Sequence, residues 1–457
     1  MAHVMSSADR PERTAPPRVV IVGGGAAGVI TAVHLLRKAD AEHPVDVHIV
    51  ERRSVLGPGL AYRTTHPLHT LNNFAGRLSA IDGDPDHLLR WCEDTGVAVS
   101  PTAFLQRATY GRYLRETLDD TTVPRGSALR RTCGVVTAVI PDGDEVAVTL
   151  SDGRSIRADV VILALGNPPP RPQPAFERLG ERYICDPWCE DLADRIGGVP
   201  EVLVLGTGLT MIDAVAQLHE AFPRTRFTAV SRHGLMPKAH RPTSSRVRDL
   251  FDPGSITSLE ALQERVRARI DEIRRSGGDW RDVVDSLRPC ANELWQCLPP
   301  EDQDRFVADH ARHWELARHR LSPQMATHVR ALQRAGTLRV ARIEEVDVFG
   351  FDRVLNCTGP APVPTQGWNS LVDSLMDAGM IRPNRLGLGL DLDRDGRVVD
   401  GNGHGNPCVH VVGAARRGME WEVTAIPDLR CQAARLAARI LRGAQGGSED
   451  APAILTA

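Results

Sequence analysis

The sequence of 457 residues is poor in lysine and carries almost no net charge. Lys38 and Lys238 are the only lysines, and arginine supplies the other basic side chains. The formal net charge is −3. Neither nucleic acid nor an anionic membrane is therefore expected as a partner, because both are bound through strongly basic surfaces.

Cysteine motifs and long apolar runs are also missing. The nine cysteines are irregularly spaced, and the closest two, Cys185 and Cys189, fit neither a zinc site nor a C-x-x-C redox motif. No metal is expected, and free thiols in a reducing compartment are the default. No apolar run could span a bilayer, and residues 1–17 are expected to be a polar, disordered tail rather than a signal peptide. These absences favour a cytoplasmic protein.

The sequence does contain two glycine-rich dinucleotide fingerprints, far apart. The first follows the apolar run Val19–Val22 and opens a helix. Gly23 allows the tight turn, Gly25 lets a pyrophosphate approach the backbone, and Gly28 lets helix and strand pack closely. The helix N-terminus attracts phosphate, and Glu51, at the end of the next strand, can accept hydrogen bonds from ribose hydroxyls. An ordinary glycine-rich turn is disfavoured because all these parts occur in register.

The second fingerprint follows Val202–Leu205 and contains Gly206 and Gly208. Its second strand ends in Ser231 and Arg232, with no carboxylate where the first unit has one. An acidic residue there would repel a 2′-phosphate, whereas serine and arginine would bind it. The pattern therefore favours NADPH over NADH. A surface arginine in an NADH enzyme is the alternative.

Each fingerprint is followed, further along the chain, by the same motif: an acidic residue, an apolar strand and a glycine. Residues 131–165 predict a three-stranded meander that ends in a buried strand and Gly166. Residues 351–359 repeat the acidic residue, apolar strand and glycine. A helix is expected from about residue 427 to 441. The predicted fold class is α/β, with two Rossmann-like dinucleotide-binding domains, each built on a parallel sheet.

Residues 255–335 have helical periodicity and no strand signals, which predicts a helical insertion in the second domain. Histidines and aromatics share one face of its last part. His310 and His313 lie three residues apart, but no carboxylate on that face completes a metal site, so a packed helix is favoured.

Several further segments resemble one known family. They are Gly59–Tyr62, His69–Asn72, Leu205–Asp213, Ser231–Gly234, Arg318–Arg320, Asn356–Gly359, and Trp421-Glu422 with Ile426-Pro427. Together they resemble the two-dinucleotide-binding flavoproteins. The narrower likeness is to nitrosuccinate-synthase-like and other N-hydroxylating flavin monooxygenases. The sequence departs from the family between Leu338 and Phe351, where the usual strands of the second domain are shortened.

The resemblance implies two cofactors, FAD and NADPH. FAD is expected at the first fingerprint, with Gly166 and Gly413 near the isoalloxazine. NADPH is expected at the second. The implied cofactor-binding residues are Gly23, Gly25, Ala26, Gly28, Glu51, Gly166, Gly206, Gly208, Leu209, Thr210, Ser231, Arg232 and Gly413.

The implied domain plan is discontinuous. Residues 18–197 and 357–443 are expected to form the FAD domain, and residues 198–356 the NADPH domain with its helical insertion. Residues 444–457 are expected to be a flexible tail.

The implied reaction is a monooxygenation by O2, in which NADPH reduces the flavin. A C4a-hydroperoxyflavin then oxidises the amine nitrogen of an amino acid or small amine. Asn72 and Glu422 are the candidate catalytic residues. Arginine suits a substrate carboxylate, and the candidate substrate residues are Arg318, Arg320, Trp421 and Arg430.

A purely structural role is the alternative for each candidate. The arginines suit surface ion pairs, Asn72 suits a turn, and Glu422 suits a cap. For the whole chain, an NAD(P)H–flavin reductase that passes electrons to another acceptor is the alternative. The Baeyer–Villiger signature is missing, and a nucleotide sensor would leave one site unused. A homo-oligomer is compatible with the sequence.

Overall fold

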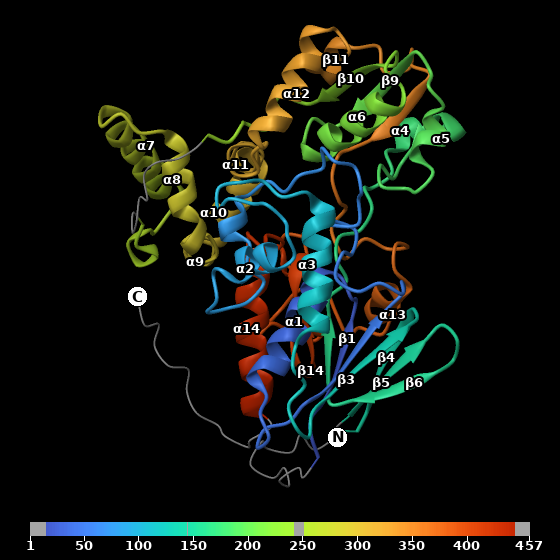
Figure 1. Cartoon of the computed structure of the whole chain (residues 1–457), viewed down its shortest axis with the longest axis vertical. Coiled ribbons are helices and arrows are strands. Elements are labelled where there is room, and N and C mark those ends of the chain that lie inside the picture. Colours follow the sequence, from blue (N-terminus) through green and yellow to red (C-terminus); the bar gives the residue numbers. More distant parts are fainter. Residues whose placement is uncertain (1–14, 144, 242–250, 444–457) are drawn as a thin grey trace.

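The computed structural model describes residues 15–143, 145–241 and 251–443 (Figure 1). Two open sheets lie at opposite ends of the molecule, and a group of helices stands beside them. A small antiparallel sheet completes the strands that are described. The predicted α/β class with parallel sheets is confirmed at this level. The predicted tail at 444–457, and all but the last residues of that at 1–17, lie outside the described residues.

The first sheet contains the first fingerprint. Its strand order is β13-β14-β7-β1-β2-β3, parallel throughout except for the β13–β14 pair. The strands are β1 (Arg18–Val22), β2 (Asp46–Glu51), β3 (Ala128–Cys133), β7 (Val160–Leu163), β13 (Arg397–Val399) and β14 (Gly405–Val411).

Both faces of this sheet are covered. Val19 and Ile21 of β1 pack on one face, against α1 (Ala26–Lys38), α3 (Arg107–Asp119) and α14 (Ile426–Gly443). The alternate residues of β1 pack on the other face, against α13 (Ser370–Asp377) and the small antiparallel sheet. Successive side chains of a strand point to opposite faces, so a strand buried on both sides is apolar throughout.

The predicted three-stranded meander is present. It consists of β4 (Val136–Asp142), β5 (Glu145–Leu150) and β6 (Ser155–Ala158), which pair in that order. The helix expected from about 427 to 441 is the longer α14.

The second sheet contains the second fingerprint, in the strand order β11-β10-β9-β12-β8, and all its pairs are parallel. The strands are β8 (Tyr183–Ile184), β9 (Glu201–Leu205), β10 (Arg226–Ser231), β11 (Leu338–Arg342) and β12 (Arg353–Asn356). Helix α6 (Leu209–Ala221) follows the glycine turn and packs with α12 (Pro323–Arg334) in one apolar core.

Two boundaries differ from the prediction. The sequence grouped residues 183–197 with the first fingerprint, whereas β8 pairs with β12 and extends the second sheet. Helix α12 lies inside the predicted insertion 255–335, but it packs on the second sheet and leads into β11. β8 is a short strand beyond a proline-rich loop, and α12 follows several other helices. The local sequence of neither element indicates which sheet it packs against.

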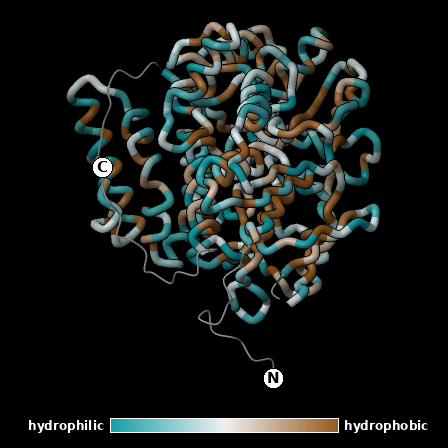
Figure 2. Tube along the Cα trace, turned by 60° about the horizontal axis from the view of Figure 1, so that its bottom comes forward, coloured by the Kyte–Doolittle hydropathy of each residue, from teal (hydrophilic) through white to brown (hydrophobic). Residues whose placement is uncertain are grey.

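Three short helices, α2 (His87–Asp94), α4 (Pro174–Glu177) and α5 (Leu192–Ile196), lie in the connections of the two sheets. The other helices form a group that we call the helical block, residues 251–318. It comprises α7 (Leu259–Arg275), α8 (Trp280–Leu287), α9 (Ala291–Cys297), α10 (Pro300–Arg305), a π-helical turn (Phe306–His310) and α11 (Ala311–Arg318). It has a core of its own, which includes Val283, Leu294 and Trp295. In Figure 2 hydrophobic and hydrophilic stretches alternate along the tube of its helices, as expected where each helix has one apolar face. In the described ranges no helix is long and apolar enough to cross a membrane.

Candidate functional site

The first glycine turn joins β1 to α1. Gly23 has φ +107°, and its N–H donates to the carbonyl of Val50 at 2.8 Å. A Cβ on Gly23 would lie 2.3 Å from the carbonyl oxygen of Ala164, and one on Gly28 would lie 1.9 Å from that of Gly23. These two glycines are therefore required by the fold itself.

Gly25 differs, because a Cβ there would meet Gly59 Cα at 3.5 Å, an ordinary contact. It is the N-cap of α1, which has no side-chain cap, and Ala26 begins the helix. Helix N-terminal N–H groups without such a cap are suited to phosphate. At the end of β2, Glu51 Oε2 accepts a hydrogen bond from the Gly24 N–H at 2.7 Å, so this carboxylate lies at the glycine turn.

The second glycine turn repeats the first. Gly206 has φ +104°, donates to the carbonyl of Val230 at 2.8 Å, and would place a Cβ 2.3 Å from the carbonyl oxygen of Cys357. Gly208 is the N-cap of α6, and a Cβ there would meet nothing within 4 Å. Leu209 and Thr210 form the first turn of α6.

The end of β10 lies beside this turn. Ser231 Oγ accepts hydrogen bonds from the Thr207 hydroxyl at 3.0 Å and the Gly234 N–H at 3.1 Å, and Arg232 is exposed. Sequence reasoning missed a second arginine here. Arg312, from the helical block, donates to Thr207 Oγ1 at 3.1 Å. Its place in a histidine- and arginine-rich stretch carries no signal of that contact.

Gly166 and Gly413, the two predicted glycines outside the glycine turns, lie in different surroundings. Gly166 follows β7 with φ +73° and has open space around its Cα. Gly413 has φ +79°, and a Cβ there would lie 3.4 Å from Ala27 Cβ and 3.5 Å from Leu429. Its N–H donates to Gln432 Oε1 at 3.0 Å. The start of α1, Gly413 and the first turns of α14 therefore converge.

Glu422, a predicted catalytic residue, is buried and engaged. Trp314 Nε1 donates to its Oε1 at 2.9 Å, and Arg318 Nη2 lies 3.5 Å from its Oε2. Its backbone N–H and carbonyl are both held by Asn292. The structure thus joins a predicted catalytic residue to a predicted substrate residue, Arg318.

Asn72, the other predicted catalytic residue, is half-buried. Its backbone carbonyl accepts a hydrogen bond from His240 Nε2 at 2.9 Å. Burial, and then the charge of Arg320, lower the pKa of His240 to about 4, so its ring is neutral near pH 7. The next residue, Asn73, faces Arg288 at 3.4 Å (Oδ1 to Nη1).

The other predicted substrate residues are dispersed. Trp421 packs in the core of the helical block, with Trp295 at 4.9 Å and the Arg417 guanidinium 3.9 Å above its ring. Arg320 is almost fully buried and donates to Asp285, and its Nε and Nη1 have no hydrogen-bond partner among the described residues. Arg430 donates to the carbonyl of Ser79 at 2.9 Å.

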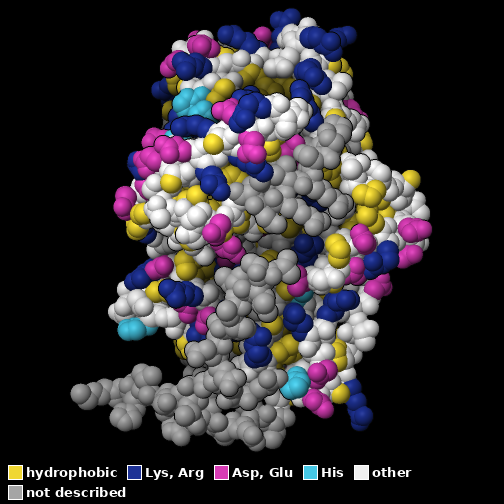
Figure 3. Space-filling view, turned by 90° about the vertical axis from the view of Figure 1, so that its left-hand side faces the viewer, with side chains coloured by type: hydrophobic (Ala, Val, Ile, Leu, Met, Phe, Trp, Pro, Cys, Tyr) yellow, Lys and Arg dark blue, Asp and Glu magenta, His cyan; other side chains and the backbone are white. Residues whose placement is uncertain are grey.

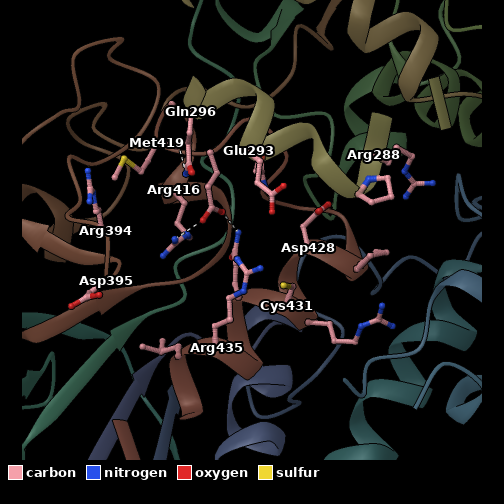
Figure 4. A pocket seen from close by; sticks show the side chains of 18 of the residues that line it. Arg288, Glu293, Gln296, Arg394, Asp395, Arg416, Met419, Asp428, Cys431 and Arg435 are labelled. Atoms are coloured by element: carbon pink, nitrogen blue, oxygen red, sulfur yellow. Dashed lines mark hydrogen bonds and ion pairs between the residues drawn. The ribbon is translucent and has the colours of Figure 1, made fainter. Parts of the chain in front are cut away.

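A cavity of about 1380 Å³ lies between the helical block, α14 and the loop around residues 384–395. Of the predicted substrate residues Arg430 lines it, as do Arg77 and Arg288. Figure 4 shows Arg288 and Asp428 on adjacent walls of this space.

On the face turned toward the viewer in Figure 3, Arg/Lys and Asp/Glu side chains are interspersed rather than separated by sign.

Two charged groups of the cavity have displaced pKa values. Burial, and then the charge of Arg318, lower the pKa of Arg288 to about 9. Burial, and then the charge of Glu422, raise the pKa of Asp428 to about 6. Within the described residues the Asp428 carboxylate makes no hydrogen bond or ion pair. Sequence reasoning assigned no role to these residues, since only the fold brings η5 (Arg288–Cys290) and the start of α14 to the same cavity.

The two sheets are connected by polar contacts between segments that the sequence singled out separately. His69 Nε2 donates to the backbone carbonyl of Asp213 on α6 at 2.9 Å. Arg107 donates to the Asp213 carboxylate at 2.6 Å. The hydroxyls of Thr70 and Ser322 lie 3.0 Å apart. In the described ranges no group of three or more His, Cys, Asp or Glu residues is arranged to hold a metal ion.

The sequence of this chain is similar to those of known proteins. A family model described as FAD-NAD(P)-binding matches residues 20–168. An L-aspartate N-monooxygenase (nitrosuccinate-forming) of Streptomyces davaonensis is 27% identical over 250 residues. That match covers 44% of this chain and 38% of the relative, well under two thirds of its length.

Solved structures match almost end to end. The L-lysine 6-monooxygenase of Pseudomonas syringae has a TM-score of 0.60 at 18% identity, covering 93% of this chain and 99% of that one. This chain shares the fold of that enzyme. An ornithine N-hydroxylase of Kutzneria sp. 744, solved with reduced FAD, NADP+ and L-ornithine, has a TM-score of 0.57 at 16% identity over the same shares. The predicted resemblance is confirmed.

Proposed function

We propose that this chain is an FAD- and NADPH-dependent monooxygenase that oxidises the amino nitrogen of an amino acid with O2. The observation that carries the proposal is the pairing of two matched glycine turns with one charged cavity. Gly23 and Gly206 close their turns by the same hydrogen bond and the same close backbone approach. A single nucleotide would need one such turn, and electron transfer between two cofactors needs both.

The first turn fits FAD. The space beside Gly25 and Gly59 would be filled by a Cβ, and the uncapped start of α1 points N–H groups toward it. Glu51 lies where ribose hydroxyls would donate to it. Gly166 and Gly413 are suited to the flavin end, because both have a positive φ that glycine favours. Gly166 also has open space beside it, whereas Gly413 packs closely against Ala27 at the start of α1.

The second turn fits NADPH. Gly208 has open space at the start of α6. Ser231 ends β10 and Arg232 follows it, at the place where a carboxylate would mark an NADH enzyme. The domain plan follows from this assignment. A discontinuous FAD domain carries the first sheet, and an NADPH domain inserted into it carries the second sheet and the helical block.

The cavity fits an amino acid. Arginine forks pair with both oxygens of a carboxylate, and Arg77, Arg288 and Arg430 line the space. Asp428 offers the opposite charge to the ammonium group. The Streptomyces davaonensis relative is named for L-aspartate, and a second carboxylate would find a partner among the same arginines.

FAD, when bound, supplies hydride acceptance and oxygen activation. The chain's own residues prepare the amine. An ammonium group has no lone pair, so its proton must leave before nitrogen can act as a nucleophile. Asp428 binds the ammonium and accepts that proton at a carboxylate oxygen, which a pKa near 6 allows.

The test is aerobic NADPH oxidation by the FAD-loaded chain, with a panel of free amino acids and amines. We expect one amino acid to accelerate oxidation, with an N-oxygenated product replacing hydrogen peroxide. Asp428→Asn should retain FAD binding and lose that acceleration. Oxidation that ignores every amine but responds to an electron acceptor would instead support a flavin reductase.

A further inference from the structure

Arg312 lies at the start of α11, outside the second sheet, yet it contacts the glycine turn of that sheet. Its Nη2 donates to the Thr207 hydroxyl and to the carbonyl of Leu235, both at 3.1 Å. Thr207 stands between the two glycines of the second fingerprint. The guanidinium is therefore held at the turn by two defined acceptors.

The same hydroxyl connects Arg312 to the end of β10. Thr207 also donates to Ser231 Oγ at 3.0 Å, and Arg232 is the next residue. Burial lowers the pKa of Arg312, and the charge of Arg232 lowers it further, while Glu315 opposes both. Both arginines thus lie at the second glycine turn, Arg312 through its hydrogen bond to Thr207 and Arg232 as the residue that follows Ser231.

Two neighbouring arginines and a serine make a site for a dianion. A phosphate between the guanidinium groups would offset their repulsion, and their planar forks match its oxygens. The first glycine turn has the opposite arrangement, with the Glu51 carboxylate at the corresponding strand end. This difference in charge would favour FAD at the first turn and NADPH at the second.

We propose that Arg312 binds the 2′-phosphate of NADPH together with Arg232 and Ser231. This inference rests on the proposed NADPH site. The helical block would then contribute to the preference for NADPH over NADH. The dinucleotide fingerprint by itself identifies 2′-phosphate ligands only at the end of its second strand.

The position of Arg312 has a structural consequence. Further along α11, Trp314 and Arg318 contact Glu422, and Glu315 accepts from Arg417 at 2.7 Å. A bound 2′-phosphate would therefore fix one end of a helix whose other residues contact the segment before α14. Hydrogen exchange of the α11 backbone amides should slow more with 2′,5′-ADP than with ADP.

The deciding experiment is calorimetric titration of the FAD-loaded full chain with 2′,5′-ADP and with ADP. Arg312→Gln should weaken 2′,5′-ADP by about tenfold, the loss expected for one charge-assisted contact, and leave ADP unchanged. Arg232→Gln should do the same. Arg226→Gln is the matched control, because Arg226 is exposed at the opposite end of β10.

An equal loss for both ligands would overturn the proposal, because Arg312 would then act only by holding the turn. Unchanged binding in Arg312→Gln would overturn it as well. If Arg312→Gln melts early, Arg312→Lys keeps the charge without the fork, and it should weaken 2′,5′-ADP by less. A wild-type chain that binds ADP as tightly as 2′,5′-ADP would reject the proposed NADPH site itself.

Discussion

Glu422 and Arg318 form a buried ion pair, with 3.5 Å between Oε2 and Nη2 and 5% of each side chain exposed. Trp314 donates to the other carboxylate oxygen. The sequence analysis proposed Glu422 as a catalytic residue and Arg318 as a substrate residue, independently of each other. Their pairing leaves neither side chain free for a substrate, whereas Asp428 lines the cavity and makes no ion pair among the described residues.

Removing one partner of this pair should be costly. Arg318→Met leaves the Glu422 charge buried without its cation, and we expect the free energy of unfolding to fall by about 3 kcal/mol. Urea denaturation followed by tryptophan fluorescence measures it. Arg318→Met combined with Glu422→Gln should recover part of the loss. Additive losses in the double variant would show that the two side chains are not coupled.

Asp428 should make stability depend on pH. Its folded pKa is raised to about 6, so its contribution is complete below its unfolded pKa near 4 and is lost as pH rises through 6. Asp428→Asn should therefore stabilise the protein by about 2 kcal/mol at pH 8 and much less at pH 4.5. Melting curves at both pH values test this. Asp304→Asn, at an exposed ion pair with Arg385, is the control and should change little at either pH. An equal gain at both values would contradict the assignment.

Alanine at two glycines of the first turn should separate folding from cofactor binding. A Cβ at Gly28 meets a backbone oxygen at 1.9 Å, so Gly28→Ala should lose about 3 kcal/mol of stability. Gly25→Ala has room in the protein, and it should fold normally but bind FAD at least about tenfold more weakly. Flavin fluorescence and melting curves give both quantities. Normal FAD affinity in Gly25→Ala would place the pyrophosphate elsewhere.

Asp213 should connect the two sheets. Asp213→Asn deprives Arg107 of a carboxylate at 2.6 Å, with side chains 17% and 7% exposed, and should cost about 2 kcal/mol. Glu220→Gln on the same helix breaks a more exposed pair with His66 and should cost about 0.5 kcal/mol. Chemical denaturation of both variants tests the difference. Equal effects would mean that the buried position of Asp213 adds nothing.

Much of the frame could be predicted from local sequence. Gly23 and Gly206 each follow an apolar strand and precede an apolar helix, and the steric demand of such a turn acts within a few residues. The meander at 136–158 was predictable for a similar reason, since turn residues separate short alternating runs. Glu51 could be placed at the first turn because the end of a neighbouring parallel strand is fixed by that topology.

The sequence by itself therefore determined the two glycine turns, their strands and the charge at each strand end, because these depend on short-range geometry. Only the tertiary structure decided that β8 extends the second sheet, that Trp421 packs in the helical block, and that Glu422 is paired with Arg318. It alone brought Arg312 to the second turn and Arg288 to the same cavity as Asp428. Such contacts join residues far apart in the chain, and packing between elements, which no local pattern encodes, sets which charges become neighbours.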